Sequence, residues 1–189
     1  MQGSQTPPKG ILVDLDDTIL VFEPLSAPSW KQVIAEAQSR IVPVEPERFY
    51  HHILDAATLY WSDAKRHQTG RLNPDAARTS FVLEAMKRVG LPLDEEWALT
   101  VARRFGQVRT EAIYPVPGAL ETLRQLNQYG IPLILVTNGD AQGQRKKIER
   151  FHLAPFFQTI LIEVFRAALC PATCAHENGP SLSVRCGVS

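Results

Sequence analysis

Three aspartates directly follow a short apolar run near the start of the chain, in the stretch GILVDLDDTIL at residues 10–20. Asp14 and Asp16 are two positions apart, so their side chains lie on the same side of an extended backbone. Two carboxylates this close repel each other, and a cation between them removes the conflict. Mg²⁺ binds hard oxygen ligands, usually one or two carboxylates together with substrate phosphate. The stretch therefore predicts a magnesium site with Asp14 and Asp16 as ligands.

A second group of polar residues closes a later apolar run, IPLILVTNGD, at residues 131–140. Thr137 offers a hydroxyl, and the turn at Asn138-Gly139 can direct backbone N–H groups toward an anion. The helix expected to begin near Asp140 adds the positive end of its dipole. We therefore expect Thr137 and Asn138 to bind a phosphate group.

Together, the two groups predict a site for a phosphate ester. Asp14 would attack phosphorus to form an aspartyl-phosphate. Asp16 would protonate the leaving oxygen and then accept a proton from water. Purely structural interpretations also exist, because aspartates after a strand can cap a turn and Thr137-Asn138-Gly139 can form an ordinary turn. Asp17 is expected to be solvated or to cap a turn.

Strands alternating with helices would position these groups. Apolar runs at residues 11–15, 131–138 and 156–165 predict three strands, and helical patterns precede the second and the third. This order is typical of a parallel α/β sheet, in which ligands bind beyond the carboxyl ends of the strands. Between the first strand and the rest, apolar residues recur at helical spacing in four segments, near residues 29–41, 49–60, 82–89 and 97–108.

The pattern predicts three parts. Residues 1–22 and 113–165 form an α/β core, residues 23–112 an inserted helical lobe, and residues 166–189 an irregular tail. A lobe inserted after the first strand would close over the site, exclude water and select the leaving group. The expected substrate is therefore a small phosphorylated metabolite.

At these motifs the chain resembles the haloacid dehalogenase-like hydrolases, over roughly residues 9–163. DLDDT matches their first motif, DxDxT, and VTNG matches their second. The helical insert lies where one subfamily carries its cap. The resemblance implies a Rossmann-like core, Mg²⁺ and phosphoryl transfer, with Asp14 as nucleophile and Asp16 as acid/base. It also implies that Asp16 binds the metal through its backbone carbonyl. The dehalogenases lack the second aspartate, so Asp16 favours a phosphatase.

The chain departs from this family after the third strand. The family carries a third motif with a lysine, usually followed by proline, and a fourth motif with one or two acids. Here no lysine follows Lys147, and Cys170-Pro171 stands about where Lys-Pro is expected. Lys146 and Lys147 are poor substitutes, because side chains at this point of the helix are expected to face solvent. The missing later strands would leave the third strand with an unpaired edge, or the core with an uncovered face.

The tail carries all three cysteines of the chain and has no clear helical or strand period. We hypothesise that it derives from a different reading frame or splice choice. Cysteine and histidine are zinc ligand types, so a zinc site is an alternative, although the spacing is unusual. Its ligands would be Cys170, Cys174, His176 and Cys186.

Composition narrows the classes of function. The 20 basic and 20 acidic residues balance, so no basic field points to nucleic acid or to a membrane. The cysteine-free first 169 residues fit a reducing compartment, and we expect a cytoplasmic protein. The favoured function is a Mg²⁺-dependent phosphatase. The alternatives are a catalytically impaired, truncated isoform that binds a partner and, within the family, a phosphomutase. The oligomeric state is not predicted.

Overall fold

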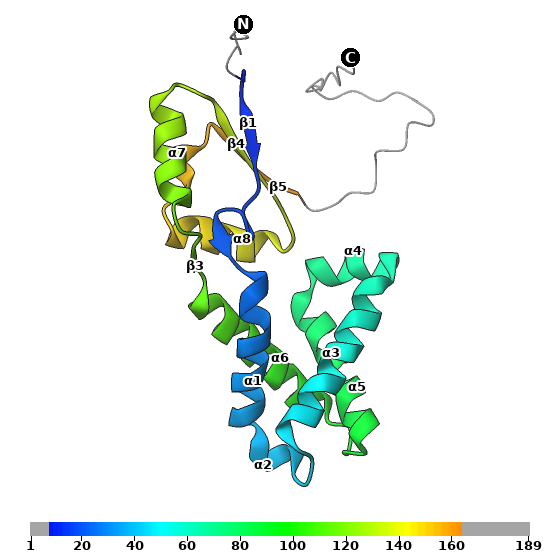
Figure 1. The fold of residues 1–189 in the computed structure, drawn as a ribbon. Coiled ribbons are helices and arrows are strands. Elements are labelled where there is room, and N and C mark those ends of the chain that lie inside the picture. Colours follow the sequence, from blue (N-terminus) through cyan, green and yellow to red (C-terminus); the bar gives the residue numbers. More distant parts are fainter. Residues whose placement is uncertain (1–7, 164–189) are drawn as a thin grey trace, which may run out of the picture.

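The computed structural model of the chain describes residues 8–163 (Figure 1). Its main sheet has three parallel strands, β1 (Ile11–Val13), β4 (Leu133–Asn138) and β5 (Thr159–Glu163), in the order β1-β4-β5. Leu135 pairs with Val13 on one side and with Ile160 on the other. The predicted parallel α/β fold is confirmed, and the residues assigned to the tail lie outside the described part.

One face of this sheet is covered by α7 (Ala119–Gln128) and α8 (Ala141–Arg150). Side chains of β4 at alternate positions point into the contact, because successive side chains of a strand point to opposite faces. The buried residues of this first hydrophobic cluster are Leu15, Ile19, Leu20, Ile113, Leu123, Leu133, Leu135, Ile148 and Leu153.

The opposite face of the sheet is much less covered within residues 8–163. Leu12 of β1 is 70% exposed and Leu161 of β5 is 50% exposed. Between them, Ile134 and Val136 of β4 are only half-buried. In the part of the chain that the structure describes, β5 also has no strand on its outer side. The expected unpaired edge and uncovered face are therefore both present there.

Six α-helices between residues 26 and 112 stand apart from the sheet (Figure 1). The sequence predicts four helical segments in this region; the structure divides the first of them into two helices and adds one helix. The additional α4 carries the polar run AKRHQTGRL, which has no apolar period by which to predict it. It begins at Asp63, whose carboxylate accepts the N–H of Arg66. The six are α1 (Ser26–Glu36), α2 (Gln38–Ile41), α3 (Pro46–Ser62), α4 (Ala64–Leu72), α5 (Pro74–Val89) and α6 (Glu95–Ala112).

These helices enclose a second hydrophobic cluster that is separate from the first. At its centre Trp30 of α1 stacks on Phe105 of α6, with ring centroids 4.0 Å apart. Phe49 and Ile53 of α3 and Val82 of α5 are fully buried beside them. The helices therefore pack around a core of their own.

Truncating Trp30 should destabilise this helical region strongly. The side chain is 3% exposed, and Trp30→Ala removes its stacking and leaves a cavity. We expect a loss of about 3–5 kcal/mol in the free energy of unfolding, measured by urea denaturation followed by circular dichroism. Leu59→Ala, at a side chain that is 58% exposed, is the control and should cost less than about 1 kcal/mol. Equal effects of the two substitutions would contradict the packing described here.

The chain passes twice between the sheet and the helical region. A two-stranded antiparallel ribbon joins the passages, formed by β2 (Leu20–Val21) and β3 (Tyr114–Pro115). Arg150 at the end of α8 donates hydrogen bonds to the carbonyl oxygens of Thr110 and Glu111, in the last turn of α6. Strands of two residues leave no readable period, so the sequence did not predict this ribbon.

Candidate active site

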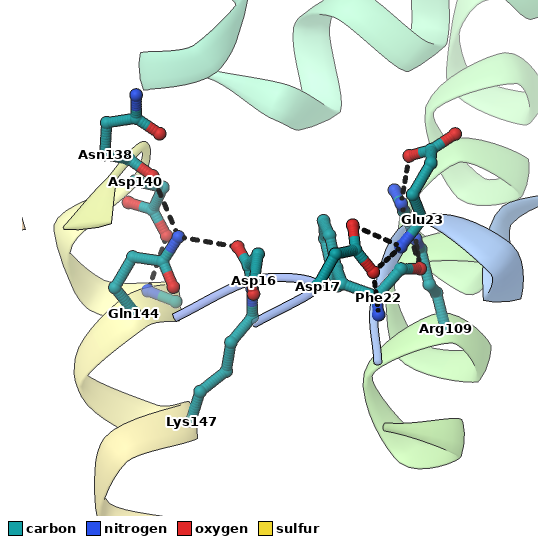
Figure 2. A network of polar contacts seen from close by, with 10 residues as sticks. Asp16, Asp17, Phe22, Glu23, Arg109, Asn138, Asp140, Gln144 and Lys147 are labelled. Carbon is teal, nitrogen blue, oxygen red and sulfur yellow. Dashed lines mark hydrogen bonds and ion pairs between the residues drawn. The ribbon is translucent and has the colours of Figure 1, made fainter. Parts of the chain in front are cut away.

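Asp16 lies at the centre of a polar network just beyond β1 (Figure 2). Lys147 Nζ donates to both carboxylate oxygens of Asp16, at 2.7 and 2.9 Å. Gln144 Nε2 donates to Asp16 Oδ2 at 3.1 Å and to the carbonyl oxygen of Asn138 at 2.9 Å. Two side chains of α8 therefore hold the Asp16 carboxylate in one orientation and tie it to the end of β4.

The position of Lys147 corrects the expectation that it faces solvent. Gln144, Lys147 and Ile148 form the buried stripe of α8. Asp140 sets the start of this helix, because its carboxylate accepts the N–H of Gly143 at 2.6 Å. The methylene stem of Lys147 can then lie against apolar groups while the ammonium reaches Asp16. Burial lowers the pKa of Lys147 below its ordinary value, and the negative charge of Asp16 opposes this shift.

Phe22 joins this network to the second passage of the chain. The Lys147 ammonium lies 3.7 Å from the centroid of the Phe22 ring, and the Arg109 guanidinium lies at the same distance. Such contacts stabilise a cation through the negative face of the ring. Arg109 also pairs with Glu23 Oε2 at 2.8 Å. Burial lowers the pKa of Arg109, an effect that Glu23 opposes.

Asp17 has a structural role in this region. Its backbone has φ of +59°, a left-handed conformation that aspartate tolerates better than most residues. Asp17 Oδ1 accepts the N–H groups of Phe22 and Glu23, at 2.9 and 3.0 Å. The interpretation of Asp17 as a capping residue is confirmed.

The structure does not bring all predicted site residues together to the same degree. Asp14 follows β1 and is exposed, at the position where strand alternation continues from exposed Leu12. Thr137 is 2% exposed, because it lies on the same face of β4 as the buried side chains of Leu133 and Leu135. Among the described residues no hydrogen bond joins Asp14 to Thr137, so their joint contact with a phosphate stays a prediction.

The turn after β4 is closely fitted to Gln144. Gly139 has φ of +123°, which a residue with a side chain rarely adopts. A Cβ atom at this position would also lie only 3.3 Å from Gln144 Nε2. Asn138 is exposed, and both it and Gly139 line the cavity described next.

A cavity of about 1340 Å³ separates the helical region from the end of the sheet. Asp16, Lys147 and Asn138 lie on its sheet side, and Trp30 and Arg78 lie on its helical side. Asp14 and Thr137 are not among its lining residues. A cavity of this size accommodates a small metabolite with its hydration.

The oxygen atoms available near Asp16 suit a hard cation. Asp14 offers a carboxylate and Asp16 a backbone carbonyl oxygen. Gln144 Oε1 is buried and has no hydrogen-bond partner among the described residues. Mg²⁺ needs only one or two carboxylates when water and phosphate complete its shell. In residues 8–163 no group of three His, Cys, Asp or Glu side chains is placed to hold a metal.

The sequence matches the haloacid dehalogenase-like hydrolases over residues 8–172. The chain belongs to this family of hydrolases. No helix of the described residues is long and apolar enough to cross a bilayer.

Two curated relatives are the glyceraldehyde 3-phosphate phosphatases of Pyrococcus abyssi and Pyrococcus furiosus, which are 24% and 25% identical over 163 residues. Both alignments cover 86% of this chain, but only 63% and 62% of the respective relatives. The chain thus spans less than two thirds of their length.

Solved structures show the same fold. The magnesium-bound HAD-hydrolase YfnB of Bacillus subtilis is 22% identical with a TM-score of 0.57, covering 80% of this chain and 61% of that one. A haloacid dehalogenase-like family hydrolase of Xanthomonas campestris is 17% identical with a TM-score of 0.55, covering 82% of this chain and 62% of that one.

Proposed function

We propose that this chain is a Mg²⁺-dependent phosphatase that hydrolyses a small phosphorylated metabolite through an aspartyl-phosphate. The observation that carries the proposal is the fixed Asp16 carboxylate, held by Lys147 and Gln144 two residues after Asp14. The names of the curated relatives support phosphatase activity. The division into a core of residues 1–22 and 113–165 and a cap of residues 23–112 is part of the proposal.

In the first step, a carboxylate oxygen of Asp14 forms a bond to phosphorus while the ester P–O bond breaks. Asp16 acts here in its acid form: it transfers its proton to the leaving oxygen, so that the alcohol departs neutral, and is left as the carboxylate that Lys147 and Gln144 hold. In the second step, water attacks phosphorus, Asp16 takes a proton from it, and the bond to Asp14 breaks to release inorganic phosphate. When bound, Mg²⁺ would offset the charge of the transferring group, with Asp14 and the Asp16 carbonyl as its ligands.

Lys147 supplies positive charge where the third-motif lysine of the family is missing from the sequence. Its ammonium lies within 2.9 Å of both Asp16 oxygens and lines the cavity. The proposed phosphate site at Thr137 and Asn138 adjoins this charge through the contact between Gln144 and Asn138.

We also place the protein in the cytoplasm, because its first 169 residues contain no cysteine.

Removal of divalent metal tests the proposal directly. The purified chain with Mg²⁺ should hydrolyse p-nitrophenyl phosphate. EDTA should lower the rate by roughly a hundredfold or more, because a metal supplies several kcal/mol of charge stabilisation. Added Mg²⁺ should restore the rate. An EDTA-insensitive rate would contradict the role assigned to the metal.

A second candidate function is a catalytically impaired form that binds a partner. It is favoured by the sequence after the third strand, where no lysine follows Lys147 and no aspartate follows Asp140, although the family carries its third and fourth motifs there. Under this alternative, the folded chain would show no Mg²⁺-dependent turnover of any phosphate monoester. The same assay therefore separates the two candidates.

A further inference from the structure

The helical side of the cavity carries more positive than negative side chains. Arg71 of α4, Arg78 of α5 and Arg103 of α6 all line it. The acidic side chains among its lining residues on α4, α5 and α6 are Asp75 and Glu111. Because Arg109 is already paired with Glu23, the three arginines outnumber Asp75 and Glu111, and one positive charge is left in excess on this wall. We call Arg71, Arg78, Arg103 and Asp75 the cap arginine cluster.

Arg78 is the most enclosed of the three cations. Its side chain is 17% exposed, and Nη1 lies 3.3 Å from Asp75 Oδ1. Its guanidinium carbon lies 5.1 Å from the centroid of the Phe105 ring. A Cβ atom on Gly106 would come within 2.8 Å of Arg78 Nη1, so the missing side chain at position 106 makes room for this guanidinium.

The charge of Arg78 is incompletely compensated. Asp75 is shared, because Arg103 Nε lies 3.9 Å from its other carboxylate oxygen. Of the five N–H groups of Arg78, one donates a hydrogen bond within the described residues. Burial, and then the nearby charge of Arg109, lower the pKa of Arg78 to about 10. A bound anion would satisfy the remaining donors and offset the charge.

We propose that the cap arginine cluster binds a second anionic group of the substrate, at the end away from the ester that is hydrolysed. The substrate class is then a phosphate monoester that carries a carboxylate or a further phosphate. Guanidinium groups match the oxygen pairs of both, so the shared chemistry is an anion with at least two acceptor oxygens. This inference rests on the proposed phosphatase function and narrows its substrate.

Matched substrates test the inference. 3-Phosphoglycerate carries a carboxylate where glycerol 3-phosphate carries a hydroxymethyl group. Propane-1,3-diol bisphosphate carries a second phosphate that the monophosphate of the same diol lacks. For the preferred anion, kcat/KM should exceed that of its neutral counterpart by roughly tenfold or more, mainly through a lower KM. The pair that shows the larger ratio identifies which anion is bound.

Two variants should remove this preference. Arg78→Met should lower kcat/KM for the anionic substrate by roughly tenfold or more, and much less for the neutral one. Gly106→Ala should act in the same direction by displacing the guanidinium, while alanine suits the helix. Arg48→Met, at an exposed position of α3 outside the cavity, is the control and should leave kcat/KM unchanged for both substrates.

Equal kcat/KM for the anionic and neutral substrates, or equal losses of both in Arg78→Met, would overturn the inference. Absence of turnover with every substrate, p-nitrophenyl phosphate included, would refute the proposed function instead. In that case titration calorimetry with 3-phosphoglycerate, propane-1,3-diol bisphosphate and their neutral counterparts decides. The inference is supported if the anionic compound of either pair binds more tightly than its neutral counterpart and if Arg78→Met weakens that binding. It is rejected if neither anionic compound binds, or if the anionic and neutral compounds bind equally.

Discussion

Replacing Asp14 by asparagine should abolish the Mg²⁺-dependent release of phosphate from p-nitrophenyl phosphate. The amide is almost the same size as the carboxylate, but it can neither attack phosphorus nor offer an anionic ligand to the metal. Loss of a residue that forms the covalent intermediate lowers kcat on the order of a thousandfold or more. Steady-state kinetics with malachite-green detection of phosphate measures the effect.

Folding should be unaffected by this change, because Asp14 is exposed and the cores lie elsewhere. The melting temperature of Asp14→Asn should stay within about 2 °C of the parent chain. Asp55→Asn, at an exposed position of α3, is the matched control and should retain full activity. If Asp14→Asn kept the rate of the parent chain, the covalent mechanism would be rejected.

Replacing Lys147 by methionine should reduce both stability and activity. The substitution keeps an unbranched apolar stem and leaves the partly buried Asp16 carboxylate without its cation. The side chain of Lys147 is 9% exposed and that of Asp16 is 22% exposed, so this pair lies between exposed and fully buried salt bridges. We therefore expect the free energy of unfolding to fall by about 2–3 kcal/mol. Activity should fall by roughly 10–100-fold, because Asp16 is no longer held and one positive charge is lost.

A conservative variant separates these two effects. Lys147→Arg keeps the charge and should recover part of kcat, whereas a purely structural role predicts that activity follows the melting temperature alone. Lys87→Met, at an exposed position of α5, is the control for loss of a surface lysine. Unchanged kcat in Lys147→Met at a temperature where it is fully folded would rule out a role for Lys147 in the reaction.

The sequence was informative wherever a pattern repeats or a motif is local. Apolar runs predicted β1, β4 and β5, and spacings of three and four predicted the main helices between residues 26 and 112. Asp14, Asp16, Thr137 and Asn138 were identified because they directly follow strands. The structure confirms the parallel sheet that carries them, while their chemical roles stay predictions.

Other features depend on contacts between distant segments, which no local pattern records. The charge run around Lys147 looked like a solvated helix face, although Gln144, Lys147, Ile148 and Phe151 share one stripe at helical spacing. That spacing was the available signal, and the preference of lysine for the surface concealed it. The different exposure of Asp14 and Thr137 likewise depends on which face of the sheet the helices cover.

The separate hydrophobic clusters determine what a common spectroscopic measurement can detect. All three tryptophans, Trp30, Trp61 and Trp97, lie in α1, α3 and α6, and none lies beside the sheet. Tryptophan fluorescence therefore reports the unfolding of the helical lobe and does not report that of the α/β lobe. Because two lobes with their own cores need not unfold in a single cooperative step, a fluorescence midpoint alone would misstate the stability of the α/β lobe.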